Sequence, residues 1–287
     1  MPLFVFVSGY FSRKYDDLGS SFRKFFKLVE TYLIFQIIFS LPSILSGDLF
    51  SMFMRPYWVL WYLFSLIIWR LFLQFAPPNL LKSNRWKMTF CIVTMLSLIA
   101  GFVPVGYELS FQRSMTFLPF FTIGYISANV KDIHIKDMLP SRFLSSLYFG
   151  LLFVAFYCVD KSYSSVFYGA TPYSSLSGSS YRFIQLILGF MGGVCFMGLI
   201  KKIKLPHSLC MMGANTLFFF VYHVFFIVTI KELVSKYDIR FSFVYTVIAY
   251  IIVMFSLYSL SQIKFLHYLL NPISSLYDKK NTSSWRS

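Results

Sequence analysis

Three ionisable side chains lie inside long apolar stretches of this sequence, where they are the groups best placed to do chemistry: Glu30, Arg70 and His223. A charged side chain at the centre of a bilayer costs about 2.5–3.5 kcal/mol on insertion scales, so each one needs a partner or a purpose. His223 lies ten residues after Gly213, the start of its apolar segment, and therefore near mid-membrane. An imidazole at that depth could position a substrate or carry a proton, and a hydrogen-bonded packing role is the alternative.

Glu30 lies four residues after the start of one apolar segment and Arg70 five residues before the end of the next, which places them at similar depths from the same side of the membrane. The simplest expectation for Glu30 is therefore a structural ion pair with Arg70. Arg70 also lies only five residues before Phe75, the end of its segment. Its long side chain could instead extend to the lipid headgroups.

The composition predicts a membrane protein. Of 287 residues, 57% are apolar, 21% aromatic and only 13% charged, which is more hydrophobic surface than one soluble core can hide. The formal charge of +15 comes from short basic clusters between apolar runs, without a basic stripe or recognition motif, which argues against a nucleic-acid partner. The four cysteines, Cys91, Cys158, Cys195 and Cys210, show no CxxC spacing, which implies neither zinc nor a disulfide framework. The sequence also has no Walker loop, GxSxG or HExxH motif, and we expect no metal and no permanently bound cofactor.

Apolar segments of helical length predict an all-α polytopic fold with about nine transmembrane segments. Eight of them are 26–45, 57–75, 88–105, 115–130, 143–159, 183–200, 213–230 and 242–263. The opening stretch 1–12 is shorter than the roughly 20 residues that cross a membrane. We expect it to be the second half of a helix that starts ahead of Met1. Lysine and arginine are concentrated on the side that holds the C-terminus, which predicts a membrane domain over 1–263 and a cytoplasmic tail over 264–287.

Four stretches lie in order along the chain: MPLFVFVSGYF at 1–11, LWYLFSLIIWR at 60–70, FLPFFTIGY at 117–125 after Arg113, and GANTLFFFVYH at 213–223. Together they resemble bacterial integral-membrane acyltransferases of the acyltransferase 3 family, in the branch similar to fucose 4-O-acetylases. The resemblance implies a ten-helix architecture. It also implies that the family's first helix, with its main catalytic histidine, lies ahead of Met1. The alternative is that the chain is a truncated remnant of the family with little activity.

The resemblance further implies a reaction and a place for it. The reaction is transfer of an acetyl group from acetyl-CoA, as donor substrate, to a sugar hydroxyl on a cell-surface polysaccharide or its lipid-linked precursor. The place is the bacterial inner membrane. His223 is the catalytic candidate within the chain. The candidates for substrate binding are Ser8, Trp61, Arg113 and Asn215, and those for donor binding are Arg13, Lys14, Arg23, Lys24 and Arg70.

Simpler interpretations remain open for two of these groups. Arg113 precedes a proline-containing segment at the expected outer face, where it could be only an interfacial anchor. The cluster of Arg13, Lys14, Arg23 and Lys24 could bind the phosphates of acetyl-CoA, or could reflect only the basic character of cytoplasmic loops.

A different functional class also stays open. A transporter or flippase of lipid-linked sugars would share this aromatic, cytoplasmically basic composition. Such a protein predicts an internal repeat or paired broken helices, and the sequence shows neither. A noncatalytic scaffold would have no need of a histidine at mid-membrane.

Overall fold

The structure is a computed structural model of the chain, and it describes residues 1–12, 18–75, 85–130, 135–158, 168–201, 203–237 and 243–275. These residues form helices and their connections, with no strand among them, which confirms the predicted all-helical class. The chain divides into two compact units, each described by itself. Unit 1 is Met1–Ser21, Ser43–Pro56 and Trp61–Ile203, and unit 2 is Phe22–Pro42, Tyr57–Leu60 and Lys204–Ser287.

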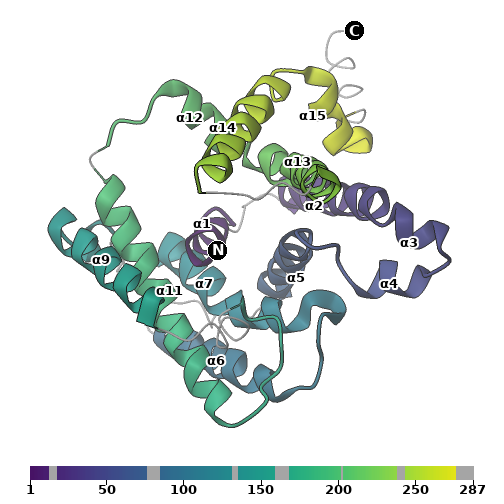
Figure 1. Cartoon of the computed structure of the whole chain (residues 1–287). Coiled ribbons are helices and arrows are strands. Elements are labelled where there is room, and N and C mark those ends of the chain that lie inside the picture. Colours follow the sequence, from purple (N-terminus) through teal and green to yellow (C-terminus); the bar gives the residue numbers. More distant parts are fainter. Residues whose placement is uncertain are drawn as a thin grey trace, which may run out of the picture. The chain divides into compact units, whose positions relative to one another are not determined.

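The elements follow one another along the chain as shown in Figure 1. Unit 1 contains α1 (Pro2–Tyr10), α4 (Leu49–Met54), α5 (Trp61–Phe75), α6 (Trp86–Ile99), the 3-10 turns η2 (Ala100–Phe102) and η3 (Glu108–Ser110), α7 (Phe111–Asn129), α8 (Ile135–Met138), α9 (Arg142–Cys158) and α11 (Ser177–Ile200). Unit 2 contains most of α2 (Leu18–Phe39), with α12 (His207–Ala214), α13 (Thr216–Tyr237), α14 (Phe243–Leu260) and α15 (Lys264–Leu270). The short α3 (Leu41–Leu45) links α2 to the segment that carries α4.

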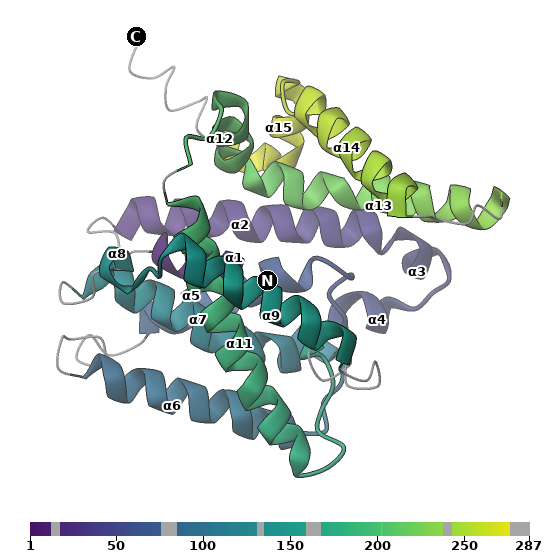
Figure 2. The same ribbon diagram turned by 60° about the vertical axis from the view of Figure 1, so that its left-hand side comes forward.

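Unit 1 is organised around the contact between α1 and α7, which lie side by side in Figures 1 and 2. A Cβ atom on Gly9 of α1 would overlap the main-chain carbonyl of Phe121, and a Cβ atom on Gly124 of α7 would overlap the main-chain carbonyl of Phe6. Each helix therefore presents a glycine to the backbone of the other. Small residues allow helices in apolar surroundings to approach this closely.

The helix α7 carries an unusually polar buried surface at its N-terminal end. It begins after two residues in the left-handed backbone region, Leu109 (φ 48°) and Ser110 (φ 50°), which turn the chain sharply into the helix. Its first turns bury Gln112, Arg113 and Ser114. These polar groups sit on a helix that is buried almost throughout, so each must find a partner within unit 1.

The number of membrane-crossing helices differs from the sequence prediction. Among the described residues, only α11 and α13 are long and apolar enough to cross a membrane, and α14 with α15 make a third if that pair, bent by 93°, is one span. The predicted nine spans are not supported. The apolar helices α5, α6 and α9 have 15, 14 and 17 residues, fewer than the roughly 20 that cross a hydrocarbon core.

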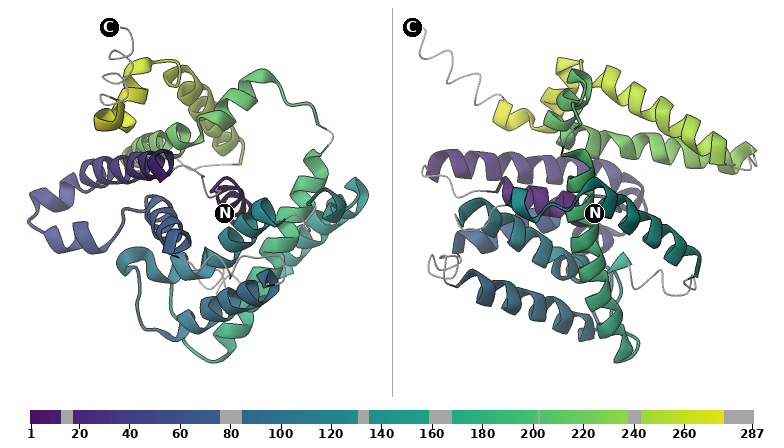
Figure 3. Two further views of the ribbon diagram at one scale, coloured as in Figure 1. Left: turned by 180° about the vertical axis from the view of Figure 1, so that it is seen from behind. Right: turned by 90° about the vertical axis from the view of Figure 1, so that its left-hand side faces the viewer.

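Unit 2 is held by an aromatic seam between α2 and α13, which run side by side in Figures 2 and 3. Phe35 lies edge-on to Tyr222 with ring centroids 5.6 Å apart, and Phe39 lies 5.0 Å from Phe225. Tyr57 stacks on the same Phe39 at 5.2 Å. Such aromatic pairs add to stability beyond the area that they bury.

Glu30 has partners other than the predicted Arg70. Its carboxylate accepts hydrogen bonds from the backbone N–H groups of Ile273, at 2.5 Å, and Ser274, at 3.1 Å, and from the Ser274 hydroxyl at 2.5 Å. Glu30 belongs to unit 2 and Arg70 to unit 1, so the ion pair between them stays a prediction. Within unit 2 the Glu30 carboxylate acts as a cap, because a carboxylate is a strong acceptor for the unpaired N–H groups at the start of the helical turn 272–275.

Candidate functional site

Arg113, near the start of α7, lies within a cage of three aromatic rings. Its guanidinium carbon is 4.1 Å from the ring centre of Tyr168, 5.3 Å from that of Trp61 and 5.7 Å from that of Tyr107. The side chain is only 7% exposed. We call these four residues the aromatic cage. Ring faces attract a desolvated cation, so the cage can hold a buried arginine without a carboxylate.

The charge of Arg113 stays uncompensated by acid within the part of the chain that the structure describes. In the same unit, Arg55 forms an ion pair with Glu108 at 3.8 Å, and both of those side chains are about half exposed. The planar guanidinium of Arg113 has five N–H donors. It is therefore equipped to bind an oxygen-rich group such as a sugar hydroxyl or an anion, and Trp61, the other predicted substrate-binding residue, lies beside it.

Ser8 of α1 is joined to Tyr62 of α5. Their hydroxyls share a hydrogen bond, and the Ser8 hydroxyl also lies 3.0 Å from the carbonyl oxygen of Phe4. The rings of Phe4 and Tyr62 are 4.9 Å apart and tilted. Tyr62 was not selected from the sequence, because nothing there distinguishes it from the other aromatic residues around Trp61.

The contact continues one turn further along α1. The Nε of Arg70 donates a hydrogen bond to the Ser12 hydroxyl at 3.2 Å, and that hydroxyl donates to the carbonyl oxygen of Ser8 at 2.6 Å. Trp61 and Arg70 are nine residues apart on α5, which corresponds to about 13.5 Å along the helix. We define the polar path as the six residues that connect the two arginines: Arg113, Trp61, Tyr62, Ser8, Ser12 and Arg70.

A second buried arginine, Arg182 of α11, fixes the end of unit 1 next to the aromatic cage. Its guanidinium donates hydrogen bonds to Gln112 Oε1 at 3.2 Å and to the carbonyl oxygen of Thr171 at 3.1 Å. Gln112 in turn donates to the carbonyl oxygens of Ala100, at 3.0 Å, and Val103, at 2.8 Å. These carbonyls follow the C-terminal end of α6, where the helix dipole favours a cation. Arg182 thereby holds the residue that precedes Arg113.

Tyr173 completes this support. The guanidinium carbon of Arg182 is 4.6 Å from the centre of its ring, and its hydroxyl donates to the carbonyl oxygen of Leu98 at 3.0 Å. Burial raises the pKa of the Tyr173 phenol, and the positive charge of Arg182 opposes this shift only in part. The phenol therefore stays protonated at physiological pH and keeps its hydrogen bond to Leu98.

His223 and Asn215 belong to unit 2. The Nδ1 of His223 lies 3.1 Å from the carbonyl oxygen of Phe219, one turn earlier on α13, and its ring is 6.0 Å from that of Phe220. A carbonyl oxygen can only accept, so a hydrogen bond at this distance requires the hydrogen on Nδ1. Asn215 ends α12, and its own carbonyl accepts the N–H of Phe219 at 3.3 Å.

The predicted donor-binding residues are spread over the chain. Arg70 lies on the polar path of unit 1, half-buried on α5. Arg23 and Lys24 are exposed near the start of α2. Arg13 and Lys14 lie outside the described residues. The structure thus brings together Ser8, Trp61, Arg70 and Arg113 in unit 1 and assigns His223 and Asn215 to unit 2.

The described residues also contain no group of three or more histidine, cysteine, aspartate or glutamate side chains that could hold a metal ion. The chemistry available in unit 1 is instead that of hydroxyls, aromatic rings and guanidinium groups. The resemblance to the acyltransferase 3 family stays a hypothesis based on four sequence stretches. Comparison with known proteins finds no family model, no curated protein and no solved structure that matches this chain.

Proposed function

We propose that this chain is a membrane O-acetyltransferase that moves an acetyl group from acetyl-CoA to a sugar hydroxyl of a cell-surface polysaccharide or its lipid-linked precursor. The observation that supports this proposal is the polar path of unit 1. Its residues lie in or next to three of the four stretches that resemble the family. Ser8 lies in the first and Ser12 directly follows it, Trp61, Tyr62 and Arg70 lie in the second, and Arg113 precedes the third.

In this proposal the two ends of the polar path have different tasks. The aromatic cage holds the sugar, because ring faces pack against sugar carbons while Arg113 donates to oxygen atoms. Arg70, about 13.5 Å away along α5, lies toward the donor and attracts the phosphates of acetyl-CoA. The pantetheine arm of the donor would lie between them.

The chemical step is an acyl transfer. The oxygen of the sugar hydroxyl attacks the thioester carbonyl, the carbon–sulfur bond breaks, and the departing CoA thiolate receives the proton that the hydroxyl loses. The hydroxyl groups of Ser8 and Tyr62 are suited to stabilise the negative oxygen that develops during the attack. The candidate for the proton transfer within this chain is His223.

The location is part of the proposal. The helices α11 and α13 are long and apolar enough to be membrane spans, which supports a location in a membrane. We propose the bacterial inner membrane with the C-terminus in the cytoplasm, because basic residues are concentrated in the segments on that side.

The test is the O-acetyl content of surface glycan in cells that lack the complete reading frame. We expect this content to fall on deletion and to return with the wild-type gene and with Arg142→Gln, which changes an exposed arginine of α9. Arg113→Gln should fail to restore it. Unchanged acetylation combined with altered glycan export would reject the acetyltransferase and favour the flippase.

A further inference from the structure

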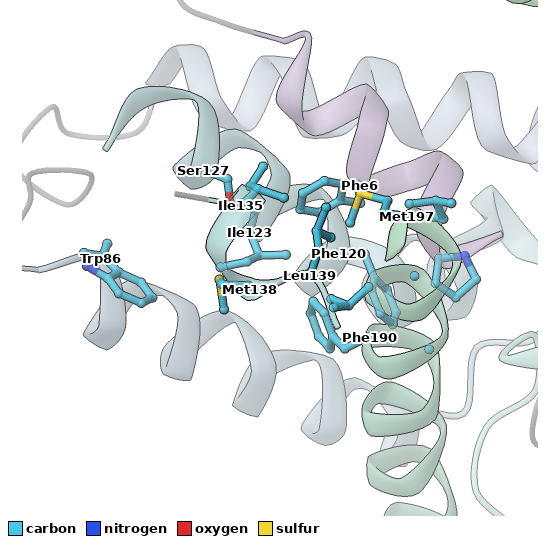
Figure 4. Close-up of a pocket in the computed structure, with 15 residues that line it drawn as sticks. Phe6, Trp86, Phe120, Ile123, Ser127, Ile135, Met138, Leu139, Phe190 and Met197 are labelled. Carbon is cyan, nitrogen blue, oxygen red and sulfur yellow. The ribbon is translucent and has the colours of Figure 1, made fainter. Parts of the chain in front are cut away.

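Unit 1 encloses a cavity of about 290 Å³ that the polar path does not use (Figure 4). Its walls come from α1, α7 and α11, with α8 and the first residue of α6 at its edge. The side chains that define it include Phe6, Ile123, Phe190 and Met197. Its volume is close to the lower limit for sites that bind small molecules.

The walls of the cavity suit hydrocarbon. Among the lining residues the one hydroxyl is that of Ser127, and it already donates a hydrogen bond to the carbonyl oxygen of Ile123 at 2.7 Å. An amide, a phosphate or a sugar inside would therefore lose its hydrogen bonds to water without replacement. An alkyl chain has no hydrogen bonds to lose, and it gains van der Waals contacts with the apolar walls.

The helix α1 separates this cavity from the polar path. Pro2, Leu3 and Phe6 line the cavity, whereas Ser8 and Ser12 contact Tyr62 and Arg70 of α5. The cavity and the polar path thus lie on different faces of one short helix. A molecule bound in the cavity is therefore not the reacting acetyl group. The proposal of a binding site in this cavity does not rest on the proposed function.

Glycines of α11 leave the space open. A Cβ atom on Gly189 would come within 2.8 Å of the Phe120 ring and 3.0 Å of Pro2, so no larger residue fits there without displacement. A Cβ atom on Gly193 would lie 3.8 Å from Leu3, in ordinary contact. A larger side chain at 193 can consequently be accommodated only by occupying the cavity.

One end of the cavity has the character of a membrane interface. Figure 4 shows Trp86 apart from the other lining side chains, at the first turn of α6. Its neighbours Arg85 and Lys87 are exposed, and the Lys87 amine is 5.7 Å from the centre of the Trp86 ring. Tryptophan is enriched at the level of lipid headgroups, and exposed cations there attract anionic lipids.

We propose that the cavity binds one acyl chain of an anionic phospholipid, with the headgroup phosphate at Arg85 and Lys87. The apolar walls select the chain, and the two cations select the charge of the headgroup. The lipid packs against α1, α7 and α11 together, and so stabilises the helices that also carry the polar path.

A photoactivatable phosphatidylglycerol tests this site. The probe carries a diazirine on one acyl chain, and the full chain is labelled in lipid nanodiscs and mapped by mass spectrometry. We expect labels on lining residues such as Ile123, Phe190 and Met197. Gly193→Leu should reduce this labelling about tenfold, because it removes space for two or more methylene groups. Gly150→Leu is the control, since a Cβ atom there meets nothing within 4 Å.

Two outcomes would overturn the proposal. Labels confined to outward-facing residues of α11, such as Met191 and Phe196, would indicate only the surrounding lipid. Equal competition by unlabelled phosphatidylglycerol and phosphatidylcholine on the wild-type protein would reject the anionic headgroup, and it needs no variant to fold. A double change of Arg85 and Lys87 to glutamine should remove the preference for phosphatidylglycerol.

Discussion

The hydroxyls of Ser8 and Tyr62 share a hydrogen bond that joins α1 to α5, one residue after Trp61 on the polar path. Both groups are neutral, and each can donate or accept. A pair of this kind can turn its hydrogens toward a developing negative charge without moving a helix. It is the part of the polar path where substrate chemistry, as opposed to substrate binding, would take place.

Tyr62→Phe tests this role. The change keeps the ring that packs on Phe4 and removes only the hydroxyl, so we expect a stability loss of about 0.5–1.5 kcal/mol. Acetyl transfer by membranes that carry the variant should fall about 100-fold or more if the hydroxyl stabilises the oxyanion. The matched control is Tyr148→Phe, which removes a hydrogen bond to the carbonyl oxygen of Leu188 elsewhere in unit 1. Similar activity losses in both variants would argue for a general stability effect.

Arg113→Lys separates recognition from anchoring. Lysine keeps the positive charge and can reach a headgroup, but it lacks the planar fork that faces Trp61 and Tyr168. If Arg113 binds the acceptor, transfer should fall about tenfold or more, through loss of hydrogen bonds to a charged group. If Arg113 is an interfacial anchor, the lysine variant should match wild type. The measurement is the transfer rate against acceptor concentration, with Arg142→Lys as the control.

Gly9→Ala and Gly124→Ala should each weaken the contact between α1 and α7. The new methyl group would overlap a main-chain carbonyl, which cannot rotate away, so the helices must separate. Overpacking of this kind costs about 1–3 kcal/mol and should lower the midpoint of thermal unfolding in detergent. Gly150→Ala in α9 has open space around it and should leave the midpoint unchanged or raise it. A stable Gly124→Ala variant would contradict the close approach of the two helices.

The raised pKa of Tyr173 predicts a dependence on alkaline pH. As pH rises through the ordinary tyrosine value of about 10, the unfolded chain releases this proton before the folded protein does. The contribution of Tyr173 to stability is therefore complete below that pH and is lost as pH rises through the folded pKa. Phenolate absorbance, as a difference between wild type and Tyr173→Phe, should show ionisation above the ordinary range. Ionisation near 10 would contradict burial beside Arg182.

The sequence predicts the helical class and nominates Ser8, Trp61, Arg70 and Arg113, because apolar runs and short motifs are local properties. The number of membrane-crossing helices cannot be read from local patterns in the same way. The apolar run 88–105 is of helical length, but α6 ends at Ile99 and a 3-10 turn follows. Periodicity does not distinguish a helix from the apolar turn that continues it.

Two important residues were missed for reasons that the structure makes clear. Arg182 precedes an apolar run and reads as a loop cation, yet α11 already begins at Ser177, through serine and glycine residues that give no helical signal. Gly9 contacts the backbone of Phe121, which is 112 positions further along the chain, so no spacing within one helix reveals this contact. Gly189 and Gly193 form a GxxxG pair that can be read from the sequence, and in the structure this pair borders the cavity.

The packing of α7 against α1 also sets the direction in which Arg113 projects from α7. Arg113 and Gly124 are eleven residues apart, close to three full turns, so they project from nearly the same side of α7. Adding or deleting one residue between them would rotate the guanidinium by about 100° and swing it out of its ring of aromatic side chains. Length between these two positions is therefore under tighter constraint than the identity of the residues that fill it.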